Sequence, residues 1–173
     1  MLNYEARLRV GRRFYETHGD DYDLLVVFTN FEFKTGEAQA FHLNARNDVD
    51  GIGLPLGNVD AAPFGSSSRL KSWIDMAAVS RYRQGPYSLE PGDPGLLETI
   101  GVLEHEMGHQ WLAYARYKAD GVQYDDLLGK DESHWSYLLD SDASFLYGAD
   151  WHDNGDGTFT AAHVKRRYSA LDL

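Results

Sequence analysis

The sequence predicts an α+β fold, with an N-terminal helix, a mixed sheet, a long second helix and a loop-rich C-terminal half. Residues 4–17 mix apolar and charged side chains in the manner of an amphipathic helix. Residues 23–31 are rich in β-branched and aromatic side chains, as in a buried strand. Residues 94–117 carry apolar side chains every three or four positions, which predicts the second helix. We expect residues 1–173 to form a single domain, because this length suffices to bury one core.

The expected sheet continues after its first strand. Residues 39–46 are predicted to form a second strand, and residues 73–79 a further one. Residues 51–57 are extended and glycine-rich, and Pro55 favours an edge position for them. Residues 85–95 are rich in proline and glycine and are interpreted as a connector to the second helix.

Composition excludes several functions. The formal net charge is −11, with 27 acidic against 16 basic residues, so nucleic-acid binding is not expected. Cysteine is absent, so any metal ion must be held by histidine or carboxylate side chains. No apolar run reaches the length of a membrane span.

The second helix has recognisable ends. Asp93 is predicted to cap its N-terminus, with Pro94 at the first helical position. The helix is expected to run to about Tyr117, because Arg116 suits the negative C-terminal end and Gly121 is a plausible stop.

Two histidines and a glutamate stand inside this segment, in the order His105-Glu106-Met107-Gly108-His109. Apolar residues trace two stripes on the helix, so it is expected to be largely buried, with its histidines at the floor of a cleft. The histidines are four positions apart and project from one side of the helix, so both can reach one metal ion. Glu106 is rotated away from that ion and can reach a water bound to it. Two core histidines bonded to backbone carbonyls are the alternative interpretation.

The motif resembles that of the zincin metallopeptidases, and its His-Glu-x-Gly-His form is similar to the metzincin branch. Metzincins carry a third histidine six residues after the second, where this chain has Ala115, so the simple metzincin pattern does not apply. The stretches HEMGHQWLAY, SHWSYLLDSDAS and LYGADW resemble uncharacterised bacterial zincin-like proteins. The resemblance implies a zincin-like fold, a Zn²⁺ cofactor and a secreted or cell-surface protein of bacterial type, although no signal peptide opens the chain.

Catalytic zinc usually takes three protein ligands and a water. His134 is expected to be the third ligand, because it stands in a loop that can fold back over the helix, next to Trp135, which could wall the site. A surface loop histidine is the alternative. Asp142 is the second candidate ligand, because its separation from His109 is similar to that in the aspzincin branch. Its distance from the following Tyr-Gly pair is longer than in that family.

Tyr147 is predicted to donate a hydrogen bond to the oxyanion of a tetrahedral intermediate, and packing beside Trp151 is the alternative. Glu132 as a ligand would make the site similar to the glutamate-ligand zincins. Asp131 and Asp140 are interpreted as solvated or capping carboxylates.

The remaining features have weaker interpretations. His42 is expected to be structural or to line the cleft, and His152 is a minor candidate ligand. Residues 153–157 could bind Ca²⁺ through their carboxylates, but a plain hairpin turn is the preferred interpretation. Residues 51–56 are the expected edge for an extended substrate. Residues 169–172 have the form of a capping box, so we expect the native chain to continue.

Together these features predict a zinc-dependent metalloendopeptidase that acts on protein or peptide substrates. Zn²⁺ held by His105, His109 and His134 would activate a water. Glu106 would take the proton as the water attacks the peptide carbonyl, then pass it to the leaving amine. A small ester or amide is a second substrate class. The alternative function is a non-catalytic, zinc-stabilised binding or structural domain of a larger surface or secreted protein, and the intact Glu106 argues against it.

Overall fold

The computed structural model describes residues 3–33, 38–48, 57–82, 94–141 and 144–162, which form an α+β fold as the sequence predicts. The chain divides into two compact units. The first unit comprises Met1–Asp48 and Gly57–Gln110, and the second comprises Val49–Leu56 and Trp111–Leu173. In the described part of the chain, no helix has both the length and the apolarity needed to cross a membrane.

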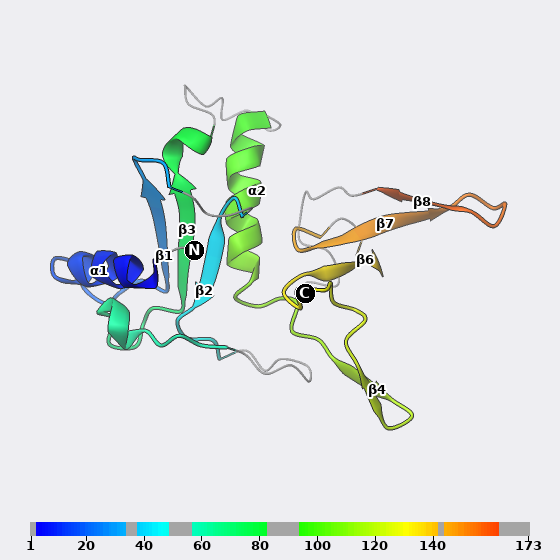
Figure 1. The fold of residues 1–173 in the computed structure, drawn as a ribbon, viewed down its shortest axis with the longest axis horizontal. Helices are drawn as coiled ribbons and strands as arrows, with labels where there is room; N and C mark the ends of the chain where they lie inside the picture. Colours follow the sequence, from blue (N-terminus) through cyan, green and yellow to red (C-terminus); the bar gives the residue numbers. More distant parts are fainter. Residues whose placement is uncertain (1–2, 34–37, 49–56, 83–93, 142–143, 163–173) are drawn as a thin grey trace. The chain divides into compact units, whose positions relative to one another are not determined.

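The first unit contains the mixed sheet and both α-helices (Figure 1). Its sheet has the order β1-β3-β2, with β1 parallel and β2 antiparallel to β3. The structure therefore confirms the N-terminal helix and the three strands predicted around residues 23–31, 39–46 and 73–79. Its helices and strands are α1 (Tyr4–Tyr15), β1 (Leu24–Thr29), β2 (Phe41–Asn44), β3 (Ser72–Ala78) and α2 (Pro94–Gly108), with short 3₁₀ helices η1 (Ala62–Phe64) and η2 (Val79–Arg81).

Strand β3 is the centre of this unit, because all seven of its residues are buried. Trp73 belongs to a core with α1, β1 and the η1 segment. Ile74 and Met76 belong to a separate cluster, against which Leu103 and Met107 of α2 pack. The apolar stripe of α2 therefore meets the sheet through β3 and β2, beside which α2 runs in Figure 1.

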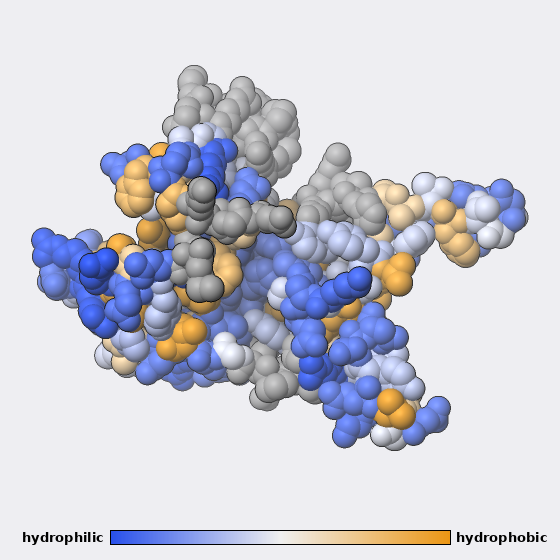
Figure 2. Space-filling view, viewed as in Figure 1, coloured by the Kyte–Doolittle hydropathy of each residue, from blue (hydrophilic) through white to orange (hydrophobic). Residues whose placement is uncertain are grey.

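Helix α1 lies unusually close to η1 at one point. A Cβ added at Gly11 would lie 2.8 Å from the carbonyl oxygen of Phe64, so only glycine fits there. Asn3 caps the N-terminus of α1 by accepting a hydrogen bond from the amide of Ala6. Hydrophilic residues cover most of the visible outer face over α1 (Figure 2), as the helical pattern of residues 4–17 predicts.

The second unit is built of strands. Strands β4 (Tyr117–Ala119) and β5 (Val122–Tyr124) form a hairpin, and β6 (Trp135–Asp140), β7 (Tyr147–Asp153) and β8 (Phe159–Ala162) form a sheet in the order β6-β7-β8. The turn predicted at residues 154–157 is confirmed, because β7 and β8 pair antiparallel around it. Only glycine fits at position 148. Gly148 has φ of 74°, and a Cβ added there would lie 2.1 Å from the Ser141 Oγ.

One prediction about the second helix is wrong. Helix α2 ends at Gly108 and does not reach Tyr117, which begins β4. Ala113 adopts a left-handed backbone with φ of 64°, which no α-helix accommodates. Arg116 pairs with Glu132 rather than with a helix end, and Gly121 is the turn residue of the β4–β5 hairpin.

Several predicted features lie outside the described residues. These are the edge segment 51–56, the helix cap at Asp93, most of the connector 85–95, the candidate ligand Asp142 and the capping box 169–172.

Candidate metal centre

Of the histidine pair predicted from the sequence, His105 lies on the last turn of α2 and His109 directly follows the end of the helix at Gly108. The rings of His105 and His109 stand edge to face, with their centroids 4.9 Å apart. Both side chains are partly buried. The four-residue spacing therefore brings the two imidazoles together at the C-terminal end of α2, as a shared metal ion requires.

Glu106, between the two histidines in sequence, is 6% exposed. Burial raises the pKa of its carboxyl to about 7, and the negative charge of Asp75 adds to this shift. A carboxylate with a pKa near neutrality can both accept and return a proton at physiological pH. Glu106 is therefore a buried carboxyl whose pKa lies close to neutrality.

Asp75 is a buried acid that the sequence reasoning missed. It lies in the middle of β3 and forms an ion pair with Arg7 of α1, with 3.3 Å between Oδ2 of Asp75 and Nε of Arg7. Each side chain is 8% exposed. A carboxylate inside an otherwise apolar strand needs a cationic partner, and that requirement was the available signal in the sequence.

His42 of β2 is a neighbour of the pair within the first unit. Its ring centroid lies 5.8 Å from that of His109, and its Nε2 lies 2.9 Å from the Ser72 Oγ. Burial lowers the pKa of His42 to about 4, so its imidazole is neutral at physiological pH. This placement beside His109 agrees with the expectation that His42 is structural or lines the cleft.

His134 is organised by its own loop in the second unit, just before β6. Its Nδ1 lies 2.6 Å from Asp131 Oδ2, a contact of the kind that orients metal-binding histidines. Partial burial of Asp131 opposes ionisation, but hydrogen bonds from His134 and from the Ser133 amide outweigh it and lower the Asp131 pKa. Asp131 is largely exposed and accepts the Ser133 amide, as expected of a solvated or capping carboxylate, and it also bonds His134.

Tyr147, the predicted oxyanion donor, packs on the same histidine. The ring centroids of Tyr147 and His134 are 4.3 Å apart, and Tyr137 stacks on Tyr147 at 5.4 Å. Tyr147 has φ of 77°, a backbone conformation that is costly for any residue with a side chain. Tyr147 therefore stands between two described aromatic rings, those of Tyr137 and His134.

The three predicted histidine ligands form a group that could hold a metal ion. His105, His109 and His134 each offer one ring nitrogen, and these nitrogens lie within 4.8 Å of one another. Imidazole nitrogens are common ligands of divalent transition metals, zinc among them. Within the described ranges, neither Glu132 nor the acidic hairpin tip belongs to a group of this kind. Glu132 is instead paired with Arg116.

Comparison with known proteins gives no further guide: no family model, no curated protein and no solved structure matches this chain. The function must therefore be inferred from the residues themselves.

Proposed function

We propose that the protein is a zinc-dependent hydrolase that cleaves peptide bonds. The observation that carries the proposal is the buried Glu106, with its pKa near 7, set between two of the three histidines whose nitrogens lie within 4.8 Å of one another. A site that only binds metal has no need of a buried, readily titrated carboxylate next to its ligands. The zincin resemblance of the His105–His109 motif points to the same chemistry.

Each residue has a defined part in this proposal. His105, His109 and His134 are the metal ligands, and Asp131 holds His134 in the tautomer that presents Nε2. When bound, zinc supplies a Lewis acid that polarises water and the substrate carbonyl. Glu106 takes the proton of the attacking water and passes it to the leaving amine.

The decisive test is Glu106→Gln, which keeps the shape of the side chain and removes its basicity. We expect peptide hydrolysis to fall by at least about 10²-fold while zinc content stays the same, because Glu106 is not a ligand. Activity is measured on a broad peptide and ester panel, with and without chelator, and zinc by metal analysis. Glu104→Gln, two residues earlier on the same helix, is the matched control and should retain parental activity.

An E106Q variant that cleaves as fast as the parent would refute the role of Glu106. If zinc instead raises the melting temperature of both proteins and neither cleaves any substrate, the zinc-stabilised structural domain becomes the better interpretation.

Tyr147 is proposed to donate a hydrogen bond to the oxyanion that develops on the substrate. Tyr147→Phe removes the hydroxyl and keeps the ring that packs on His134. We expect kcat to fall on the order of 10²-fold with zinc affinity unchanged. Tyr137→Phe, the neighbouring ring of the same stack, is the control, and an equal loss in both variants would count against the assignment.

A further inference from the structure

The residue directly after the motif is a buried glutamine. Gln110 is 3% exposed, and its backbone amide donates to the Met107 carbonyl just beyond the end of α2. Its backbone carbonyl accepts a hydrogen bond of 2.7 Å from Asn47 Nδ2. The main chain at this point is therefore tied both to α2 and to the segment that follows β2.

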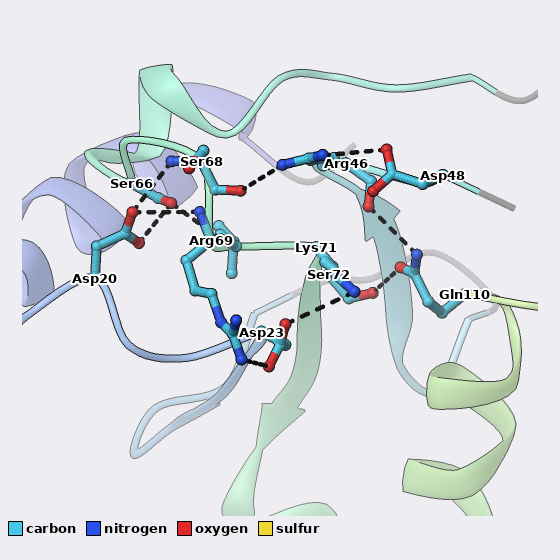
Figure 3. A network of polar contacts seen from close by, with 11 residues as sticks. Asp20, Asp23, Arg46, Asp48, Ser66, Ser68, Arg69, Lys71, Ser72 and Gln110 are labelled. Carbon is cyan, nitrogen blue, oxygen red and sulfur yellow. Dashed lines mark hydrogen bonds and ion pairs between the residues drawn. The ribbon is translucent and has the colours of Figure 1, made fainter.

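The side chain of Gln110 is tied at both ends as well (Figure 3). Its Oε1 accepts a hydrogen bond from the hydroxyl of Ser72, the first residue of β3. Its Nε2 donates to the carbonyl oxygen of Arg46 at 3.3 Å. Ser72 is fully buried, and its hydroxyl also meets the Nε2 of His42.

These bonds allow one arrangement of protons. The Arg46 carbonyl can only accept, so the amide nitrogen of Gln110 must face it and the amide oxygen must face Ser72. Ser72 has one proton, which goes to that oxygen, and so it can only accept from His42. His42 must then carry a proton on Nε2.

His109 sits within this arrangement. It precedes Gln110 by one residue, and its ring lies beside that of His42. Because a buried polar group that loses its partner is costly, the network resists rotation of Gln110 and with it any shift of the adjoining backbone.

We infer that the Gln110–Ser72–His42 network is a positioning device for the metal ligand His109. The three residues of the network do not contact the substrate. They keep the imidazole of His109 in the orientation that binds the metal ion. This inference rests on the proposed zinc site. The competing view is that the network only joins β3 to the end of α2 and contributes to stability alone.

Two variants and a matched control separate these views. Ser72→Ala removes the central hydroxyl, and Gln110→Met removes both polar ends of the amide at similar length. Ser66→Ala is the control, because Ser66 is also a buried serine of the first unit, 2% exposed, and bonds Asp20 and the Leu70 amide instead. Ser72→Thr, which restores a hydroxyl, is the conservative rescue.

The measurement is the affinity of the full chain for Zn²⁺ by competition with a chelator, at a temperature where circular dichroism shows every variant folded. We expect Ser72→Ala and Gln110→Met to weaken zinc binding about 10–100-fold. We expect Ser66→Ala to lower the melting temperature with parental zinc affinity, and Ser72→Thr to recover most of the loss. With Co²⁺ as the probe, the absorption bands should change in Ser72→Ala and stay parental in Ser66→Ala.

Zinc affinity tests the role of the network, and peptide hydrolysis tests the proposed function, so each can fail without the other. Parental zinc affinity in both Ser72→Ala and Gln110→Met would overturn the inference and leave the hydrolase proposal standing. An equal loss of affinity in Ser66→Ala would overturn it in favour of a general stability effect. A parent chain that binds no Zn²⁺ would overturn both, whereas normal zinc binding without hydrolysis would refute the hydrolase proposal alone.

Discussion

The histidine side chains are held in place in different ways in the two units. In the first unit, His105 lies on the last turn of α2 and His109 directly after it, and α2 packs on the fully buried strand β3. The same unit contains a buried ion pair and a buried amide network. In the second unit, His134 is held by the carboxylate of Asp131, which is 55% exposed, and by the ring of Tyr147. The positions of His105 and His109 therefore depend on the packing of the whole first unit. The position of His134 depends on a short loop.

This difference predicts which substitutions change stability and which change metal binding alone. Arg7→Met should have the largest effect, because it leaves the Asp75 carboxylate buried without its cation. We expect the free energy of unfolding to fall by about 3–5 kcal/mol, measured by urea denaturation. Arg13→Met, in the exposed pair with Glu16, is the control and should change it little.

The double variant Arg7→Met, Asp75→Asn should recover part of that loss, since no unpaired charge remains. Equal destabilisation by Arg7→Met and Arg13→Met would show that the first unit does not depend on its buried ion pair for stability.

Acid should weaken the first unit through Asp20. Its carboxylate accepts hydrogen bonds from the side chains of Ser66 and Ser67 and from the backbone amides of residues 67–69 (Figure 3). Partial burial opposes ionisation, but these bonds outweigh it and hold the pKa of Asp20 well below its usual range. The stabilisation is therefore complete above the unfolded-state pKa of about 4 and is lost as pH falls towards the lower folded-state pKa.

Asp20→Asn should accordingly lower the free energy of unfolding by on the order of 2 kcal/mol at pH 7. It should also flatten the dependence of stability on pH below about 4. Asp21→Asn, the adjacent acid, is the control and should keep the parental slope. If the two variants give the same pH profile, Asp20 does not anchor the 66–69 loop.

The smallest effect on stability is expected in the second unit. Asp131→Ala should weaken zinc binding about 10–100-fold, because His134 loses the partner that fixes its tautomer. The free energy of unfolding should change by less than about 1 kcal/mol, since the carboxylate is largely exposed. Chelator competition and urea denaturation measure the two quantities.

Asp126→Ala removes the same charge from an exposed position of the same unit and is the matched control. Loss of zinc affinity in both variants would assign the effect to overall charge, and a large loss of stability in Asp131→Ala would remove the distinction between the units.

The elements of the first unit could be predicted because their patterns are local. The amphipathic period of α1 and the β-branched run of β1 depend on near neighbours in the chain. The end of α2 could not be predicted, because the residues after His109 are compatible with a helix. The helix ends at Gly108, two residues before Gln110 accepts a hydrogen bond from Ser72 of β3, a residue distant in the sequence.

In the candidate site too, local sequence patterns predict some residues, and others depend on contacts distant in sequence. His105, Glu106 and His109 could be identified from their spacing on one helix, and His134 from its loop. Asp75 and Gln110 could not, because each has a role only through partners distant in sequence, Arg7 and Ser72. A buried charge or amide predicts that a partner exists, but not which residue it is.

Gly148 has a consequence for how this sequence can vary. Its positive φ and the 2.1 Å separation between an added Cβ and the Ser141 Oγ exclude every side chain at that position. Among drifting descendants of this protein, selection for a folded chain alone would preserve that glycine, even in lineages that had lost the histidines. A descendant without the histidines but with the glycine would therefore have lost the proposed metal site and kept the fold.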